Sequence, residues 1–191
     1  MKRLNLGCGR NHIEGWINLD HMPLPGVDVV ADLNACATTP LPFDDSSVDE
    51  ILMSHVIEHI ANTLPLMQEL HRIAKPDTKL NILVPHGGSD DAWEDPTHVR
   101  PYFPGSFGYF SQPYYWRADY GYRGDWQPEK VILRIGQKDC EGYSVQELWL
   151  RSRRERNLVR EMAVTLRAVK PAREPLRDLQ EQPTIEIVWV P

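Results

Sequence analysis

The opening of the chain constrains its fold most. An apolar run at residues 4–6 breaks at Gly7-Cys8-Gly9, and a second run, at residues 16–19, ends on Asp20. This order is typical of α/β proteins that bind a nucleoside-containing ligand at the carboxyl ends of parallel strands. Glycine has no Cβ, so backbone amides can approach the ligand closely. The Asp20 carboxylate can accept hydrogen bonds from both hydroxyls of a ribose.

The spacing argues against a dinucleotide. A dinucleotide fingerprint needs a third glycine, a full helix and an acidic residue about 20 positions further on. His12 occupies the position of the third glycine, and Asp20 follows Gly9 too soon for a normal helix. A nicotinamide cofactor is therefore disfavoured, although an NAD-dependent sugar-modifying enzyme stays open as an alternative.

Five segments in the first half resemble one family. The motif at residues 4–9 resembles the first motif of class I S-adenosylmethionine-dependent methyltransferases, in a small bacterial branch similar to the methyltransferase type 11 family. The pieces that follow resemble later motifs in the same order, at residues 29–33, 41–51, 51–60 and 70–80. The resemblance implies S-adenosyl-L-methionine as the cofactor and a methyltransferase activity.

The resemblance also implies where the cofactor binds. Asp20 matches the ribose-binding acidic residue, Asp32 and Leu33 lie where the adenine binds, and Asn5 replaces an acidic residue near the cofactor's ammonium group. Ser54 and His55 end the fourth strand, where ligands meet open α/β sheets. The predicted cofactor-binding residues are Asn5, Gly7, Cys8, Gly9, Asp20, Asp32, Leu33, Ser54 and His55.

The expected fold follows from the same resemblance. We expect an α/β protein with a doubly wound, mostly parallel, Rossmann-like sheet of the seven-stranded type, a shortened first crossover and an antiparallel edge. Residues 1–191 would form one domain. Residues 1–85 would bind the cofactor, 86–128 would form a substrate or lid insertion, and 129–191 would hold the C-terminal strands and a long helix.

Composition limits the partners. The net charge of −6 disfavours binding to nucleic acid phosphates. No apolar run approaches the roughly 20 residues of a membrane span, and because the first strand begins almost at Met1 we expect no signal peptide. Cys8, Cys36 and Cys140 are odd in number and lack metal-type spacing, so we expect reduced thiols in the cytoplasm. We expect a monomer or homodimer.

Later elements can be placed coarsely. Asn62 or Thr63 would cap a helix whose residues Leu66, Leu70 and Ile73 face the sheet, and strands are expected at residues 79–84, 130–135 and 184–190. A short helix is expected near residues 104–110. Ser144-Val145-Gln146-Glu147 has capping-box spacing and would open a long helix. That helix would bury Leu148, Leu158, Met162 and Leu166, reach toward Val169, and carry Arg151, Arg153, Arg154, Arg156 and Arg160.

The segment from residue 86 to about 126 supplies the candidate substrate site. Its acidic and histidine residues are Asp90, Asp91, Glu94, Asp95 and His98, and Asp95-Pro96-Thr97-His98 resembles a loop of the same methyltransferase branch. His98, Asp95 or His55 could act as the general base. The alternative is a solvated loop in which Asp95 caps a turn and His98 packs. We expect no metal, because no helix or hairpin spacing fixes a coordination geometry.

The expected reaction is methyl transfer to a hydroxyl or amine of a small polar acceptor, with a saccharide as one candidate. Aromatic residues between positions 102 and 126 could line the acceptor pocket, although many must belong to the core. A noncatalytic subunit that binds a partner through the arginine-bearing helix is the other alternative.

Overall fold

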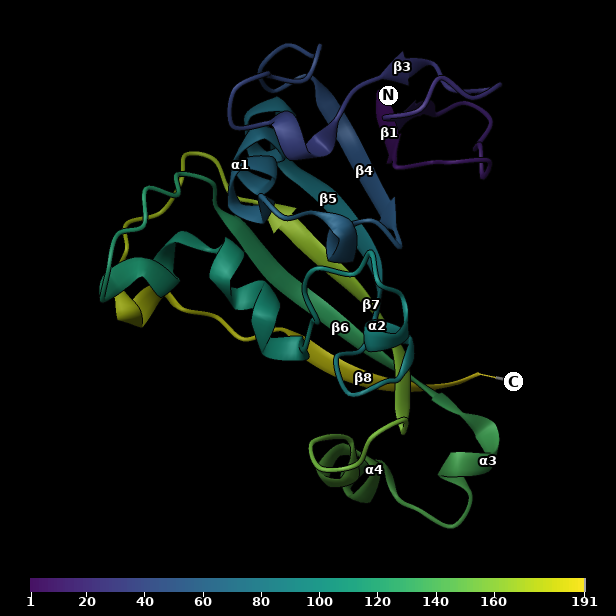
Figure 1. The fold of residues 1–191 in the computed structure, drawn as a ribbon. Helices are drawn as coiled ribbons and strands as arrows, with labels where there is room; N and C mark the ends of the chain where they lie inside the picture. The colour runs from purple at the N-terminus through teal and green to yellow at the C-terminus, as the bar shows by residue number, and fades with distance from the viewer. Residues whose placement is uncertain (191) are drawn as a thin grey trace.

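The chain folds around one eight-stranded sheet. The computed structural model describes residues 1–190, and the strands lie in the order β3-β2-β1-β4-β5-β7-β6-β8 (Figure 1). In chain order they are β1 (Arg3–Leu6), β2 (Ile17–Asp20), β3 (Val29–Val30), β4 (Val48–Ser54), β5 (Ala74–Pro85), β6 (Trp126–Gly136), β7 (Val159–Ala168) and β8 (Thr184–Val190).

The strand directions confirm the mostly parallel α/β sheet. β1 lies between β2 and β4 and is parallel to both, with Leu4 opposite Ile17 on one side and Ile51 on the other. β7 runs antiparallel to β5 and β6, and β8 closes the sheet parallel to β6. The antiparallel strand therefore lies inside the sheet, two strands from its edge.

The first crossover is short because asparagine side chains hold it in place of a helix. Residues 7–16 contain no helix. The buried Asn5 amide donates to the Asn11 carbonyl and to Asn18 Oδ1, each at 2.9 Å, and Asn18 Oδ1 also accepts from the Ile13 amide at 2.9 Å. These bonds satisfy polar groups that would otherwise be buried without partners.

The helices are α1 (Thr63–Ile73), α2 (Asp91–Glu94), α3 (Gln137–Cys140) and α4 (Val145–Ser152). The 3₁₀ turns are η1 (Leu33–Ala35), η2 (Ile57–His59), η3 (Pro104–Phe110), η4 (Gln112–Trp116) and η5 (Arg177–Leu179). The helix expected from residue 62 or 63, the short helix at 104–110 (a 3₁₀ helix) and the strands at 79–84, 130–135 and 184–190 are all found. No helix among residues 1–190 is long and apolar enough to cross a membrane.

α1 provides much of the core on one face of the sheet. Leu66, Met67, Leu70 and Ile73 are fully buried and share a single apolar cluster with Leu80 of β5. Burying each such side chain contributes about 1.5–3 kcal/mol. Their spacing of three or four residues places them on the side of α1 that faces β4 and β5 (Figure 1).

The opposite face of the sheet carries many polar side chains along β5, β6 and β7, next to half-buried apolar ones. Alternate residues of β5, β6 and β7 form side-chain ladders: Lys79 and Arg167 bind Glu129 at 2.6 and 2.9 Å, and Thr165 donates to Asn81 at 3.1 Å. Side chains alternate between the two faces along a strand, so the buried sequence neighbours of these polar residues point to the core.

The predicted long helix at the C-terminal end is wrong. α4 begins after Ser144 with the expected capping box but ends at Ser152, and Leu158, Met162 and Leu166 belong to the approach to β7 or to β7 itself. Leu158, Met162 and Leu166 are four residues apart, and this spacing fits a helix or a strand equally well. Asn157, with φ of 60°, separates the two elements. Of the five arginines only Arg151 lies on α4, the next three follow its end, and Arg160 lies on β7, so they share no helical face.

Candidate active site

A cavity of about 610 Å³ opens at the carboxyl ends of the first strands, which is the size range of ligand pockets. Five of the predicted cofactor-binding residues line it: Gly7, Asp20, Asp32, Leu33 and His55. The other lining residues were not predicted from the sequence; they are His21, Ala31, Asn34, Val56, His59, Ile60 and Thr97. We refer to this cavity as the cofactor pocket.

The glycine turn and Asp20 form one hydrogen-bonded unit. Gly7 has φ of 60°, and a Cβ on it would lie 2.5 Å from a Val56 methyl carbon, so only glycine fits. The Gly9 amide donates to Asp20 Oδ2 at 2.8 Å, and the Met22 amide donates to Oδ1 at 3.0 Å. Asp20 Oδ1 also lies 3.1 Å from His21 Nδ1, whereas Oδ2 keeps a second lone pair that a ribose hydroxyl can use.

The environment of Asp20 keeps its side chain ionised. Burial opposes ionisation, but the hydrogen bonds from the Met22 and Gly9 amides, with His21 nearby, outweigh it and hold the pKa of Asp20 below its usual range. A buried carboxylate that stays charged is a strong hydrogen-bond acceptor. Asp20 is thus suited to bind a diol, and it also shapes the turn.

Asp32 and Leu33 are neighbouring residues in the lining of the cofactor pocket. Asp32 Oδ1 accepts from the Asn34 amide at 2.9 Å and so caps η1, which is the structural role considered for it. Its side chain is exposed, whereas Leu33 is only 6% exposed and presents an apolar surface. An apolar residue beside a carboxylate suits a flat base that carries an exocyclic amine.

Four predicted cofactor residues lie outside the lining. Asn5 is 4% exposed beneath the first crossover, and Cys8 is 3% exposed. Gly9 shapes the turn through its bond to Asp20, and Ser54 ends β4 with an exposed side chain that lines neither this cavity nor the next. The structure therefore places these four around the cofactor pocket and not at its surface.

A smaller cavity of about 350 Å³ adjoins the first, and His55 lines both. It contains all three candidate bases, His55, Asp95 and His98. Its remaining lining is Pro85, Asp91, Glu94, Arg160 and Glu161. We refer to this cavity as the acceptor pocket.

His55 is held between two carboxylates. Its backbone has φ of 54°, its Nε2 lies 2.9 Å from Glu161 Oε1, and its Nδ1 lies 3.5 Å from Glu58 Oε1. The contact with Glu58 raises the pKa of His55, burial opposes it, and Glu161 raises it further. This environment favours the protonated ring, which makes His55 a better positioning group than proton acceptor.

Asp95 and His98 lie on the loop that closes the acceptor pocket. Asp95 Oδ1 accepts from the Thr97 amide at 2.8 Å and from its hydroxyl at 2.6 Å, and these bonds hold the pKa of Asp95 below its usual range. His98 Nε2 lies 3.8 Å from Asp95 Oδ2, and the His98 ring packs against the His59 ring with centroids 4.7 Å apart. The turn-capping and packing roles considered for these residues are both present, and the same contacts aim them at the pocket.

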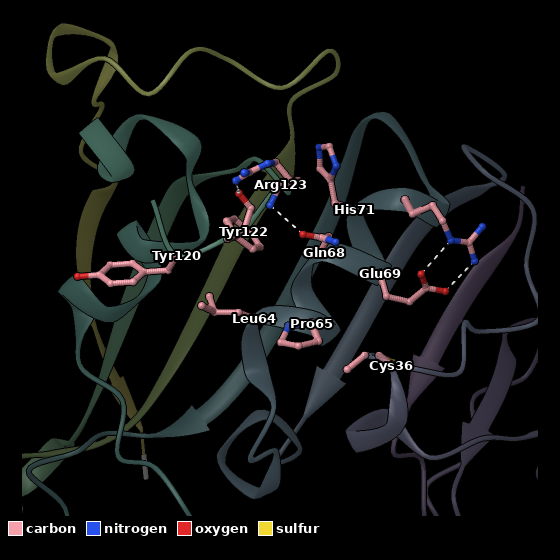
Figure 2. A pocket seen from close by; sticks show the side chains of 12 residues that line it. Cys36, Leu64, Pro65, Gln68, Glu69, His71, Tyr120, Tyr122 and Arg123 are labelled. Atoms are coloured by element: carbon pink, nitrogen blue, oxygen red, sulfur yellow. Dashed lines mark hydrogen bonds and ion pairs between the residues drawn. The ribbon is translucent and has the colours of Figure 1, made fainter. Parts of the chain in front are cut away.

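The aromatic residues line other hollows. Figure 2 shows one, between α1 and residues 120–123, where the Arg123 amide donates to Gln68 Oε1 at 2.8 Å. A neighbouring hollow is lined by seven aromatic residues: Tyr102, Phe103, Tyr109, Phe110, Tyr114, Tyr115 and Tyr120. Neither contains His55, Asp95 or His98, so the aromatic residues do not line the acceptor pocket.

Known structures share this fold. A SAM-dependent methyltransferase from Archaeoglobus fulgidus is 18% identical with a TM-score of 0.61, over 87% of this chain and 86% of that one. The YcgJ protein of Bacillus subtilis is 11% identical with a TM-score of 0.55, over 88% and 92%. A protein of Haloferax volcanii, from a complex with the Trm112 methyltransferase activator, is 16% identical with a TM-score of 0.52, over 88% and 82%. At these identities the likeness concerns the fold.

A family model gives the more specific result. The model described as a methyltransferase domain, of type 11, matches residues 4–82, which run from β1 into β5 and include the glycine turn and Asp20. No curated protein sequence matches the chain. The family match and the shared fold agree with the resemblance in the sequence and set aside the NAD-dependent alternative. Residues 4–82 thus match a type 11 methyltransferase domain, and the chain as a whole has the fold of S-adenosylmethionine-dependent methyltransferases.

Proposed function

We propose that the protein transfers the methyl group of S-adenosylmethionine to a hydroxyl group of a small, polar, hydroxyl-rich acceptor. The observation that carries this proposal is the position of His55, which lines both the cofactor pocket and the acceptor pocket. A methyl group at the boundary of the two pockets would face an acceptor held beyond it.

The cofactor pocket fits an adenosyl group in its polar and apolar parts. Asp20 would bind the ribose hydroxyls, Asp32 the exocyclic amine of the adenine, and Leu33 its face. Gly7 lets the turn pack closely against Val56, which also lines this pocket, because Gly7 lacks the Cβ that would displace Val56. Asn5 keeps the first crossover in place beneath them through its bonds to Asn11 and Asn18.

The cofactor's sulfonium makes its methyl carbon electrophilic, so the protein needs no covalent nucleophile. Its work is to hold the acceptor oxygen in line behind the methyl group, and such positioning can supply much of the rate acceleration. The oxygen forms the new bond to carbon, the carbon–sulfur bond breaks with its electron pair on sulfur, and the hydroxyl proton leaves to a group of the acceptor pocket.

The acceptor pocket favours hydroxyl-rich molecules. Asp91, Glu94, Asp95 and Glu161 offer carboxylate oxygens that accept from hydroxyls, and Arg160 can donate to them. The volume of about 350 Å³ suits a monosaccharide-sized group. An amine acceptor would also be attracted by these carboxylates, and the substrate panel below separates the two.

Calorimetry tests the cofactor half of the proposal. We expect S-adenosylmethionine and S-adenosylhomocysteine to bind one per chain and NAD not to bind. Ala31→Phe, which fills the cofactor pocket, should abolish this binding. Ala37→Phe, which fills the hollow of Figure 2 instead, should leave it unchanged. Equal binding by the two variants would refute the pocket assignment.

Turnover tests the acceptor half. S-adenosylhomocysteine formation is measured with a panel of sugars, sugar acids and small amines. We expect turnover with a hydroxylated member of the panel. Turnover with amines alone would refute the hydroxyl assignment. Tight cofactor binding with no turnover would favour a noncatalytic subunit. The structure offers that subunit no arginine-bearing helix face, because Arg151 pairs with Glu155, and Arg160 lies on β7.

A further inference from the structure

Three potential metal ligands meet where the cofactor pocket and the acceptor pocket adjoin. Glu58 and His59 belong to η2, and His98 comes from the loop that closes the acceptor pocket. We infer that these three side chains bind a divalent transition-metal ion, such as Zn²⁺ or Mn²⁺. This departs from the expectation of no metal. The role of the ion in catalysis rests on the proposed function, whereas its binding does not.

The buried carboxylate of Glu58 is the first group at this place that lacks a hydrogen-bond partner. The residue is 2% exposed, and neither carboxylate oxygen reaches solvent or makes a hydrogen bond to any of residues 1–190. Its nearest charged neighbour is His55, with Nδ1 3.5 Å from Oε1. A buried carboxylate without hydrogen bonds is costly, and such groups are normally paired or bind a metal.

The imidazole of His98 is the second group without a hydrogen-bond partner at this place. Its side chain is only 9% exposed, and its buried Nδ1 makes no hydrogen bond within the described part of the chain. An imidazole nitrogen with its lone pair free is a common metal ligand. Two unsatisfied buried groups on separate elements therefore point to one place.

The geometry needs only a small adjustment. The ligand atoms of Glu58, His59 and His98 all lie within 4.8 Å of one another. Ligands bound to one ion at about 2.1 Å are roughly 3.4 Å apart in a tetrahedral site, so side-chain rotations of modest size would close it.

The second ring nitrogen of each histidine has a neighbour that can orient the ring, as is common around metal ions. His59 Nδ1 lies 3.3 Å from the Thr97 carbonyl and 3.0 Å from its hydroxyl oxygen, which leaves Nε2 for the ion. Hydrogen bonding of the second ring nitrogen commonly orients a histidine ligand. Asp95 Oδ2 lies 3.8 Å from Nε2 of His98 and can orient that ring in the same way, which leaves Nδ1 of His98 for the ion.

The ligand set selects the kind of ion. Two imidazoles and one carboxylate suit Zn²⁺, Mn²⁺ or Fe²⁺, whereas Mg²⁺ and Ca²⁺ prefer sites made of oxygen alone. Three protein ligands also leave a coordination position open, as in catalytic metal sites.

The location gives the ion a role in methyl transfer. His59 lines the cofactor pocket and His98 lines the acceptor pocket, so the open position would face the acceptor hydroxyl. A bound ion lowers the pKa of such a hydroxyl, which lets a weak base such as the Asp95 carboxylate receive the proton. In this arrangement His98 is a metal ligand and not the general base.

Metal titration of the full chain, stripped with a chelator, tests the site. Calorimetry with Zn²⁺ and electron paramagnetic resonance with Mn²⁺ should each show one ion per chain. His59→Ala and His98→Ala should each weaken binding by at least about 10-fold, the lower limit seen even for residues that only support a ligand. His12→Ala, a change at an exposed histidine outside both pockets, should bind as the wild type does.

Glu58→Gln separates a metal ligand from a structural residue. Without metal, the variant should melt at or above the wild-type temperature, because a buried carboxylate that makes no hydrogen bond is replaced by a neutral amide. Zn²⁺ should raise the melting temperature of the wild type and not that of the variant. A lower melting temperature for the metal-free variant would show that Glu58 is a structural partner of His55 and would overturn the inference.

Three further results would overturn the inference: no ion bound, unchanged affinity in both histidine variants, or Mg²⁺ bound as tightly as Zn²⁺. S-adenosylhomocysteine binding to the same samples is a separate readout. A chain that binds Zn²⁺ but not S-adenosylhomocysteine would uphold the metal site and refute the proposed function.

Discussion

Mild acid should destabilise this protein through His86. The residue follows β5 and is 4% exposed. Its Nδ1 accepts a hydrogen bond from the Gly88 amide at 3.1 Å, and its ring packs edge-to-face on Phe103 with centroids 5.2 Å apart. Burial lowers the pKa of His86 to about 4, so the folded protein holds the ring neutral where an unfolded chain would protonate it.

The sign and size follow from linkage. A depressed pKa in the folded state means that the unfolded chain binds more protons below pH 6.5, so stability falls as the pH falls. With pKa values of about 4 folded and about 6.5 unfolded, the loss between pH 7 and pH 5 is about 2 kcal/mol. Below pH 4 the loss levels off at about 3 kcal/mol.

Urea denaturation at a series of pH values, for the wild type and His86→Asn, isolates this effect. The asparagine oxygen can still accept from the Gly88 amide but does not titrate. The variant should be less stable at pH 7, because it loses the contact with Phe103, and the gap should narrow by about 2 kcal/mol at pH 5. Other titrating groups are common to both proteins and cancel. A gap that stays constant or widens would refute the reasoning.

Two other substitutions test a buried ion pair and the glycine turn. Asp125→Asn should cost about 3 kcal/mol in urea denaturation, because Asp125 is fully buried and accepts three hydrogen bonds from Arg173, whose charge would keep only the exposed Glu181, 3.6 Å away. Asp119→Asn, in an exposed pair, should have no measurable effect, and an equal loss in both would contradict this. Gly7→Ala should weaken S-adenosylhomocysteine binding at least about 10-fold and lower stability by about 1–3 kcal/mol, because φ is 60° and the added carbon lies 2.5 Å from a valine methyl. In the control Gly105→Ala, the added Cβ has no neighbour within 4 Å, so neither binding nor stability should change. Tight S-adenosylhomocysteine binding by the Gly7 variant would argue against the need for glycine in this turn.

Local patterns predicted the elements that local chemistry determines. The strand-glycine-strand-acid order placed β1, β2 and the turn that Asp20 holds, and the spacing of Leu66, Leu70 and Ile73 predicted α1. The capping box at Ser144 predicted where α4 begins. Each of these depends on residues close together in the chain.

What the sequence could not predict depends on tertiary packing. The residues of β7 fit a helix by spacing, and they form a strand because β5 and β6 present open edges on both sides. The contact between His55 and Glu161 joins distant parts of the chain, so nothing in the local pattern marked Glu161. Likewise, burial of Glu58 without a hydrogen bond becomes visible only once the loop carrying His98 is folded over it.

A crystal structure of the chain with S-adenosylhomocysteine tests the central claim most directly. The account predicts the ribose hydroxyls on Asp20, the adenine between Asp32 and Leu33, and the sulfur directed toward His55 and the acceptor pocket. Density for the ligand in another cavity, or a ligand whose ribose makes no contact with Asp20, would contradict it.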